Sequence, residues 1–204
     1  MNKTTKQIIH ELKHHSPFTI WATLIAIILV LFILQFTDFI ISESWFEYAH
    51  TLHIFASAII TSAIFYKCKP NFIQALLVGI TGASIIGSLS DVLLPYSASL
   101  IFGLEIEFHF PIIEEPVMIL SSLLLGSIFG ITTKLTKLPH LIHVFLSVFA
   151  GLFYLLAFSS SINPLFFATA FLIVSVTVLV PCCISDIVFP FLFLGDKIKT
   201  CKYK

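Results

Sequence analysis

The chain has 204 residues, of which 58% are hydrophobic and 11% charged, and its formal net charge is zero. This composition excludes an ordinary soluble globular domain. We therefore expect an integral membrane protein surrounded by membrane lipids, with no nucleic acid as a partner.

Six apolar stretches follow one another along the chain, each near or above the roughly 20 residues that an α-helix needs to cross a bilayer. They are apolar on every side, whereas the strands of a membrane barrel alternate apolar with polar residues. The first stretch lacks a small-residue cleavage site, so we expect it to stay as a span rather than to be removed as a signal peptide. The predicted spans are Pro17–Phe36, Ala49–Tyr66, Phe72–Leu94, Ile112–Thr133, His140–Phe158 and Pro164–Leu194.

The lysines predict how these spans are oriented. With six spans, one side of the membrane receives both termini and all 11 lysines, and the chain has no arginine. The positive-inside rule makes that side cytoplasmic, so we expect a multi-pass protein of the cell membrane with its N- and C-termini in the cytoplasm. All four cysteines also fall near this side, which suits reduced thiols. The acidic residues of the opposite side are Asp38, Glu43, Glu47, Asp91, Glu105, Glu107, Glu114 and Glu115.

Polar motifs recur in one order along the chain. The string HxxHxFxS begins at His50 and again at His140, and SDxxxP follows it at Ser90 and at Ser185. Upstream of each copy, a pattern H-x4-(H/E)-x-P leads to Pro17 or to Pro116. Such repetition is expected of two halves that descend from one duplicated unit, here residues 1–95 and 96–204.

Each unit holds three spans, so the second unit must start from the opposite side of the membrane. The predicted fold class is therefore an all-α integral membrane protein with six transmembrane helices arranged as two inverted three-helix repeats. This arrangement places one polar cluster near each membrane face, and each cluster takes its first ligands from the other repeat. The outer cluster contains His50, His53, Asp91, His109 and Glu114, and the inner cluster contains His10, His15, His140, His143 and Asp186.

These residue types predict metal binding. Residues three apart on a helix point the same way, so His50 and His53 can bind one ion, with Ser57 one turn deeper. Imidazoles combined with carboxylates suit a divalent transition metal, namely zinc, iron, manganese, cobalt or nickel, rather than calcium or magnesium. Ser90 and Ser185 precede the two aspartates and are candidates to orient them. A proton or hydrogen-bond network without a metal is the competing interpretation.

Two further patterns lead to smaller predictions. Glu105, Glu107 and His109 alternate with apolar residues, which would place their side chains along one edge of an extended outer loop. Gly126 and Gly130 fall in the fourth span, where small residues let helices approach closely.

The leading functional hypothesis is a divalent transition-metal ion transporter, because inverted halves with an ion site at each mouth suit alternating access. The alternative is a membrane-embedded metal-dependent enzyme acting on a lipid or prenyl-type substrate, with His50, His53 and Asp91 around zinc and Glu114 or Glu115 as general base. An accessory subunit or sensor is a third hypothesis, and a haem protein is less favoured. The sequence assigns no catalytic residue, and it is compatible with a homo-oligomer.

Overall fold

The computed structural model describes residues 3–37 and 40–193. Within these ranges it describes the side chains of residues 16–37, 40–136, 142–179, 181, 189 and 193. The described regular elements are all helical. They are α1 (Lys3–Phe36), α2 (Glu43–Cys68), α3 (Phe72–Ser88), the π-helix η1 (Leu89–Leu93), α4 (Leu94–Ile101), α5 (Pro111–Glu114), α6 (Pro116–Thr133), α7 (Lys137–Ala157) and α8 (Pro164–Leu192).

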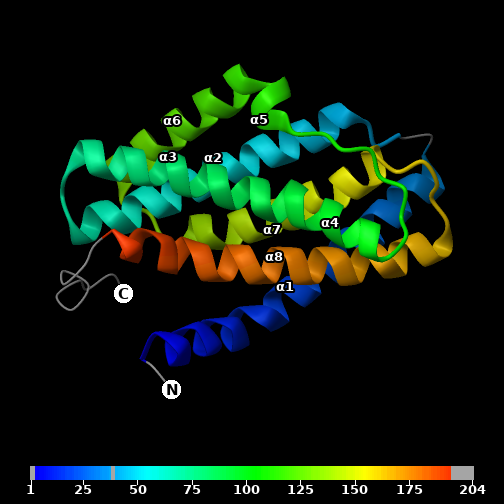
Figure 1. Cartoon of the computed structure of the whole chain (residues 1–204), viewed down its shortest axis with the longest axis horizontal. Helices are drawn as coiled ribbons and strands as arrows, with labels where there is room; N and C mark the ends of the chain where they lie inside the picture. The colour runs from blue at the N-terminus through cyan, green and yellow to red at the C-terminus, as the bar shows by residue number, and fades with distance from the viewer. Residues whose placement is uncertain (1–2, 38–39, 194–204) are drawn as a thin grey trace.

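Helix α2 forms the centre of the bundle (Figure 1). It packs against α3, α6, α7 and α8, while α1 lies against α7 and α8. Its buried side chains run from Phe46 to Phe65 and include the polar residues His50, His53, Ser57, Thr61 and Ser62. A row of polar groups therefore passes through the interior of an otherwise apolar bundle.

Four helical stretches are long and apolar enough to cross a membrane, which indicates a multi-pass membrane protein. They are Ser16–Phe36, Glu43–Cys68, Phe72–Ile101 and Pro116–Thr133. Two further apolar helices, Ile142–Ala157 and Pro164–Leu179, are shorter over their described residues. The helical class predicted from composition is thus confirmed, while the six-span count and the orientation remain predictions.

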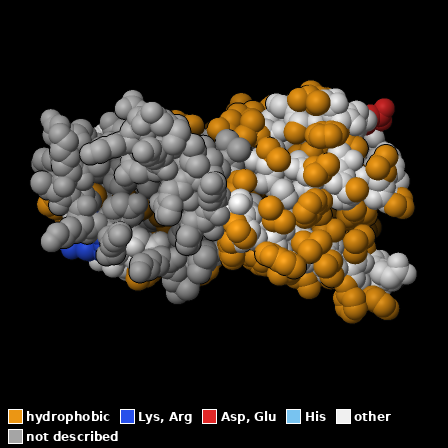
Figure 2. All heavy atoms as spheres, turned by 90° about the horizontal axis from the view of Figure 1, so that it is seen from below, with side chains coloured by type: hydrophobic (Ala, Val, Ile, Leu, Met, Phe, Trp, Pro, Cys, Tyr) orange, Lys and Arg blue, Asp and Glu red, His pale blue; other side chains and the backbone are white. Residues whose placement is uncertain are grey.

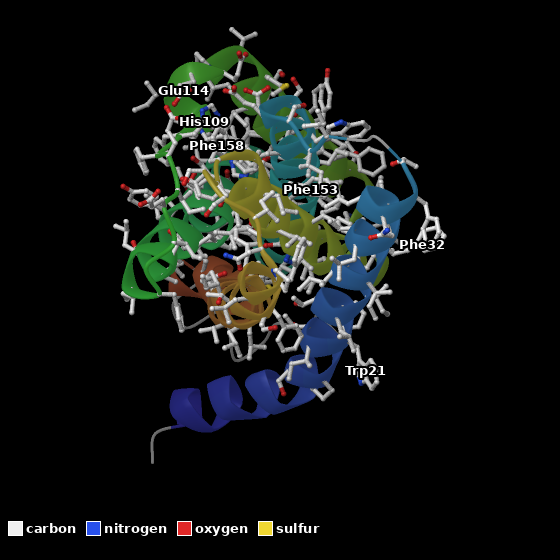
Figure 3. The ribbon with its side chains drawn as sticks, turned by 90° about the vertical axis from the view of Figure 1, so that its right-hand side faces the viewer. Trp21, Phe32, His109, Glu114, Phe153 and Phe158 are labelled. Carbon is white, nitrogen blue, oxygen red and sulfur yellow. The ribbon has the colours of Figure 1, made fainter. Side chains whose placement is uncertain are left out.

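The outer surface of the bundle suits contact with lipid. Trp21 and Phe32 project outward from α1 and are 62% and 61% exposed (Figure 3). Figure 2 shows that the described part of one long face is mainly hydrophobic and that charged side chains are seen only towards the ends of the molecule. Exposed apolar side chains of this kind are expected where acyl chains replace water.

Two glycines of α6 let this helix approach the backbone of α2. A Cβ atom added at Gly126 would lie 2.5 Å from the carbonyl oxygen of Phe55, and one added at Gly130 would overlap the backbone of Ile59. The predicted close packing at Gly126 and Gly130 is therefore confirmed. It brings α6 against the helix that carries His50 and His53.

The prediction of reduced thiols was wrong for Cys68. This residue, the last of α2, forms a disulfide whose partner lies outside the described side chains. The end of α2 is therefore joined covalently to another part of the chain.

We predict that Gly130→Ala destabilises the fold by about 1–3 kcal/mol, because the added methyl group meets backbone atoms that cannot rotate away. The matched control is Gly151→Ala on α7, where the nearest atom would be 3.7 Å away, an ordinary van der Waals distance. Thermal unfolding in detergent should show a lower midpoint for Gly130→Ala and an unchanged or slightly higher one for Gly151→Ala. Equal midpoints would mean that α2 and α6 do not approach this closely.

Candidate metal centre

Asp91 lies in the π-helix η1, which interrupts the long helix formed by α3 and α4. The N–H of Leu94 donates to the carbonyl of Leu89, five residues earlier, instead of the usual four. Pro95 follows and has no N–H with which to continue the α-helical pattern at the carbonyl of Asp91. Single π-turns of this kind are frequent at functional sites. Here the π-turn carries the one carboxylate that is wholly buried among the described side chains.

Two imidazoles of α2 converge on this carboxylate. The Nδ1–H groups of His50 and His53 both donate to Asp91 Oδ2, over 2.8 Å and 2.6 Å. The spacing of three residues places both rings on one face of α2, as predicted. All three side chains are 0% exposed. We call His50, His53 and Asp91 the buried centre.

Two hydroxyl groups satisfy the other carboxylate oxygen. Ser90 Oγ and Ser147 Oγ each donate to Asp91 Oδ1 over 2.7 Å. Burying a charged carboxylate costs several kcal/mol unless hydrogen bonds or charges replace the lost water. Here four hydrogen-bond donors from α2, η1 and α7 replace the lost water around Asp91. Ser90 therefore orients Asp91 as predicted, and Ser147 joins it from the second copy of the HxxHxFxS string.

His143 also reaches this site, so the prediction of two clusters at opposite membrane faces was wrong for this residue. Its ring stacks on that of His53, with centroids 5.6 Å apart and planes 8° apart. The physical reason is that α2 and α7 pack antiparallel along their length. Phe46 near the start of α2 contacts Tyr154 near the end of α7, and contacts between the two helices then continue inward to His53 and His143.

His109 and Glu114 lie together at one end of the bundle (Figure 3), and they form a group separate from the buried centre. His109 Nδ1 is 2.6 Å from Glu114 Oε2 and 3.3 Å from Glu43 Oε1, while its Nε2 is 3.9 Å from Glu47 Oε1. The expectation that His109 and Glu114 complete the site of His50 was therefore wrong. We call Glu43, Glu47, His109 and Glu114 the rim site.

Glu43 and Glu47 were not predicted as ligands, although the sequence carries a signal for them. Glu43, Glu47 and His50 follow one another at intervals of four and three residues, which places them in one stripe along a helix.

The outer loop does not place the side chains of Glu105, Glu107 and His109 along one edge, as was predicted. Glu105 and Glu107 are exposed but His109 is buried, because the bridge between Ile106 and Ser159 holds the loop against the end of α7.

Four predicted ligands of the inner cluster, His10, His15, His140 and Asp186, lie outside the described side chains. Their assignment as metal ligands remains a prediction. Within the described part of the chain, His143 and Ser147 of α7 belong to the surroundings of Asp91.

The residues of the buried centre could hold a metal ion. One ligand atom from each of His50, His53 and Asp91 lies within 4.8 Å of the others. His50 Nε2 is buried and has no hydrogen-bond partner among the described residues. Two nitrogen atoms and a carboxylate suit a divalent transition metal, because calcium and magnesium prefer oxygen alone.

No known protein family, curated protein or solved structure matches the chain.

We predict that Ser147→Ala lowers the free energy of unfolding by about 1–3 kcal/mol, because it removes one of four donors to a buried charge. The matched control is Ser127→Ala on α6, since Ser127 is equally buried but its hydroxyl has no hydrogen-bond partner among the described residues. Denaturant unfolding in detergent micelles should separate the two variants. A loss of the same size for Ser127→Ala would show that the bond to Asp91 contributes no special stability.

Proposed function

We propose that the protein is a membrane carrier for a divalent transition-metal ion and that the buried centre is its ion site. The carboxylate of Asp91 is fully buried and pairs with the imidazoles of His50 and His53, and all three residues lie in helical stretches long and apolar enough to cross a membrane. This observation carries the proposal. Ionisable groups at such positions are costly to bury and commonly mark the paths of ions or protons.

The depth of the buried centre supports transport. His53 follows Glu43, the first residue of α2, by ten residues and precedes Cys68, the last, by 15. At 1.5 Å per residue it lies about 15 Å from the start of the helix. That distance is half of the roughly 30 Å of hydrocarbon in a bilayer. Carrier sites lie near this midplane, where they can be exposed to either side in turn.

The hydrogen bonds of the buried centre also offer a way to release the ion. In this proposal the metal binds His50 and His53 through Nδ1, the atoms that donate to Asp91 when no ion is bound. A metal ion and these protons therefore compete for the same nitrogen lone pairs, and ligating nitrogen atoms must be free of protons. Exchange of the ion for protons is therefore a route of release that these residues offer.

We further propose that residues 1–95 and 96–204 are inverted repeats and that the ion passes between them. His143 and Ser147 of the second copy adjoin His53 and Asp91 of the first. By the same correspondence, His140 and Asp186 would receive the same ion on its way inward, and His10 and His15 would line the cytoplasmic side. Both termini are cytoplasmic in this arrangement, as the lysine distribution favours.

The test is uptake of Mn²⁺, Co²⁺, Ni²⁺ and Zn²⁺ into proteoliposomes, each followed with a dye enclosed in the vesicles. We expect uptake of at least one ion by the native chain and its loss in His53→Ala and Asp91→Asn, because each removes a ligand of the buried centre. His143→Ala should also reduce uptake if the second copy takes part.

The matched control is Ser62→Ala. Ser62 is a buried polar residue of the same helix and donates to the carbonyl of Ser127 on α6, away from Asp91. The Ser62→Ala variant should retain ion uptake. Native-level uptake in both His53→Ala and Asp91→Asn would contradict the proposal. Metal binding without any uptake would contradict transport and favour the membrane-embedded enzyme, which lipid analysis of the same vesicles would test.

A further inference from the structure

We infer that the rim site is a second divalent-cation site, separate from the buried centre and open to water. It would take a hydrated transition-metal ion at the end of the bundle where α2 begins. The site itself follows from the arrangement of its three carboxylates around one imidazole. Its place as the first station of a transported ion rests on the proposed function.

The exposure of its members fits capture of an ion from solution. The side chains of Glu43 and Glu114 are 55% and 47% exposed, whereas Glu47 is 16% and His109 only 5% exposed. Two carboxylates therefore face water above an imidazole that lies at the base of the site. An ion could bind the exposed oxygen atoms while it still keeps part of its water shell.

The orientation of His109 is that of a metal ligand. Its Nδ1 faces both Glu43 and Glu114, and the three ligand atoms lie within 4.8 Å of one another. Its Nε2 is buried without a hydrogen-bond partner among the described residues and points towards Glu47, 3.9 Å away. Ligating histidines commonly donate their second N–H to a carboxylate, which fixes the ring. Glu47 is placed to do this once Nδ1 binds an ion.

The other features of the site favour a cation. Phe110 N–H donates to Glu114 Oε1 over 3.0 Å, which holds the carboxylate with its other oxygen directed at His109. Three carboxylates surround one imidazole, and no lysine occurs in the sequence between Lys69 and Lys134. Even a protonated His109 would leave an excess of negative charge at the rim site. Such an excess attracts cations and raises their local concentration.

An aromatic layer separates the rim site from the buried centre. Phe46 is 0% exposed and lies between Glu43 and His50 along α2. Its ring stacks on His50 with centroids 5.5 Å apart and meets the edge of His109 at 5.8 Å, with Tyr154 and Phe158 beside it. The two groups of ligands therefore cannot share one ion. An ion that moves between them must pass Phe46.

The experiment measures bound Co²⁺ per chain by equilibrium dialysis and elemental analysis of the full-length protein in detergent. We expect two ions in the native protein. Glu43→Gln combined with Glu114→Gln should retain one ion. It should lower the Co²⁺ affinity of the rim site by more than the roughly 10- to 100-fold that follows removal of an orienting partner. The ion kept by this variant would show that the protein is still folded.

The matched control is Glu105→Gln combined with Glu107→Gln. It removes the same charge from the same end of the molecule, but both side chains are exposed and Glu105 Oε2 pairs with Ser160. This control should keep two ions. Equal losses in the two double variants would overturn the inference, because general surface charge would then explain binding.

His53→Ala separates this inference from the proposed function. It should lose the ion of the buried centre and keep the ion that depends on Glu43 and Glu114. A native protein whose single ion is lost only in His53→Ala would overturn the rim site while the proposed function stands. A single ion lost only in the Glu43 and Glu114 variant would confirm the rim site and count against the buried centre.

Discussion

The carboxylate of Asp91 is the constraint on which the centre of this bundle depends. A charged group with no exposed surface requires donors on both of its oxygen atoms, since unpaired it would cost several kcal/mol. His50 and His53 supply them from α2, Ser90 from η1 and Ser147 from α7. These three segments must therefore meet at one point, and the π-turn at Asp91 is the local distortion that accompanies this meeting.

Helix α2 carries ligands of both sites, at two different depths along its length. On one side, Gly126 and Gly130 bring α6 against its backbone, and on the other side α7 packs antiparallel to it. Along its length, α2 carries carboxylates at the water-exposed end and imidazoles at the middle, with Phe46 between them. An ion that followed this helix inward would first meet a site with mainly carboxylate ligands and later one with mainly imidazole ligands. It could then lose its water in steps rather than at once, which lowers the cost of desolvation at each step.

Much of the buried centre could be predicted from the sequence, because its information is local. His50 and His53 share a helix face through their spacing, and an aspartate within a long apolar stretch needs partners of this kind. The remainder could not be predicted. Whether His143 lies beside His53 or at the far face depends on where along their lengths two antiparallel helices meet. The separation of His109 from His50 depends on the packing of Phe46 between them.

By itself, the sequence determined that this is a helical membrane protein, that imidazoles and carboxylates recur at set intervals, and that small residues line one face of α6. These properties follow from composition and periodicity, which act over a few residues. Only the tertiary structure decided that His143 and Ser147 join the surroundings of Asp91 and that Glu43 and Glu47 join His109. Contacts between segments distant in the chain are set by the depth, register and direction at which helices pack, and no local pattern specifies these quantities.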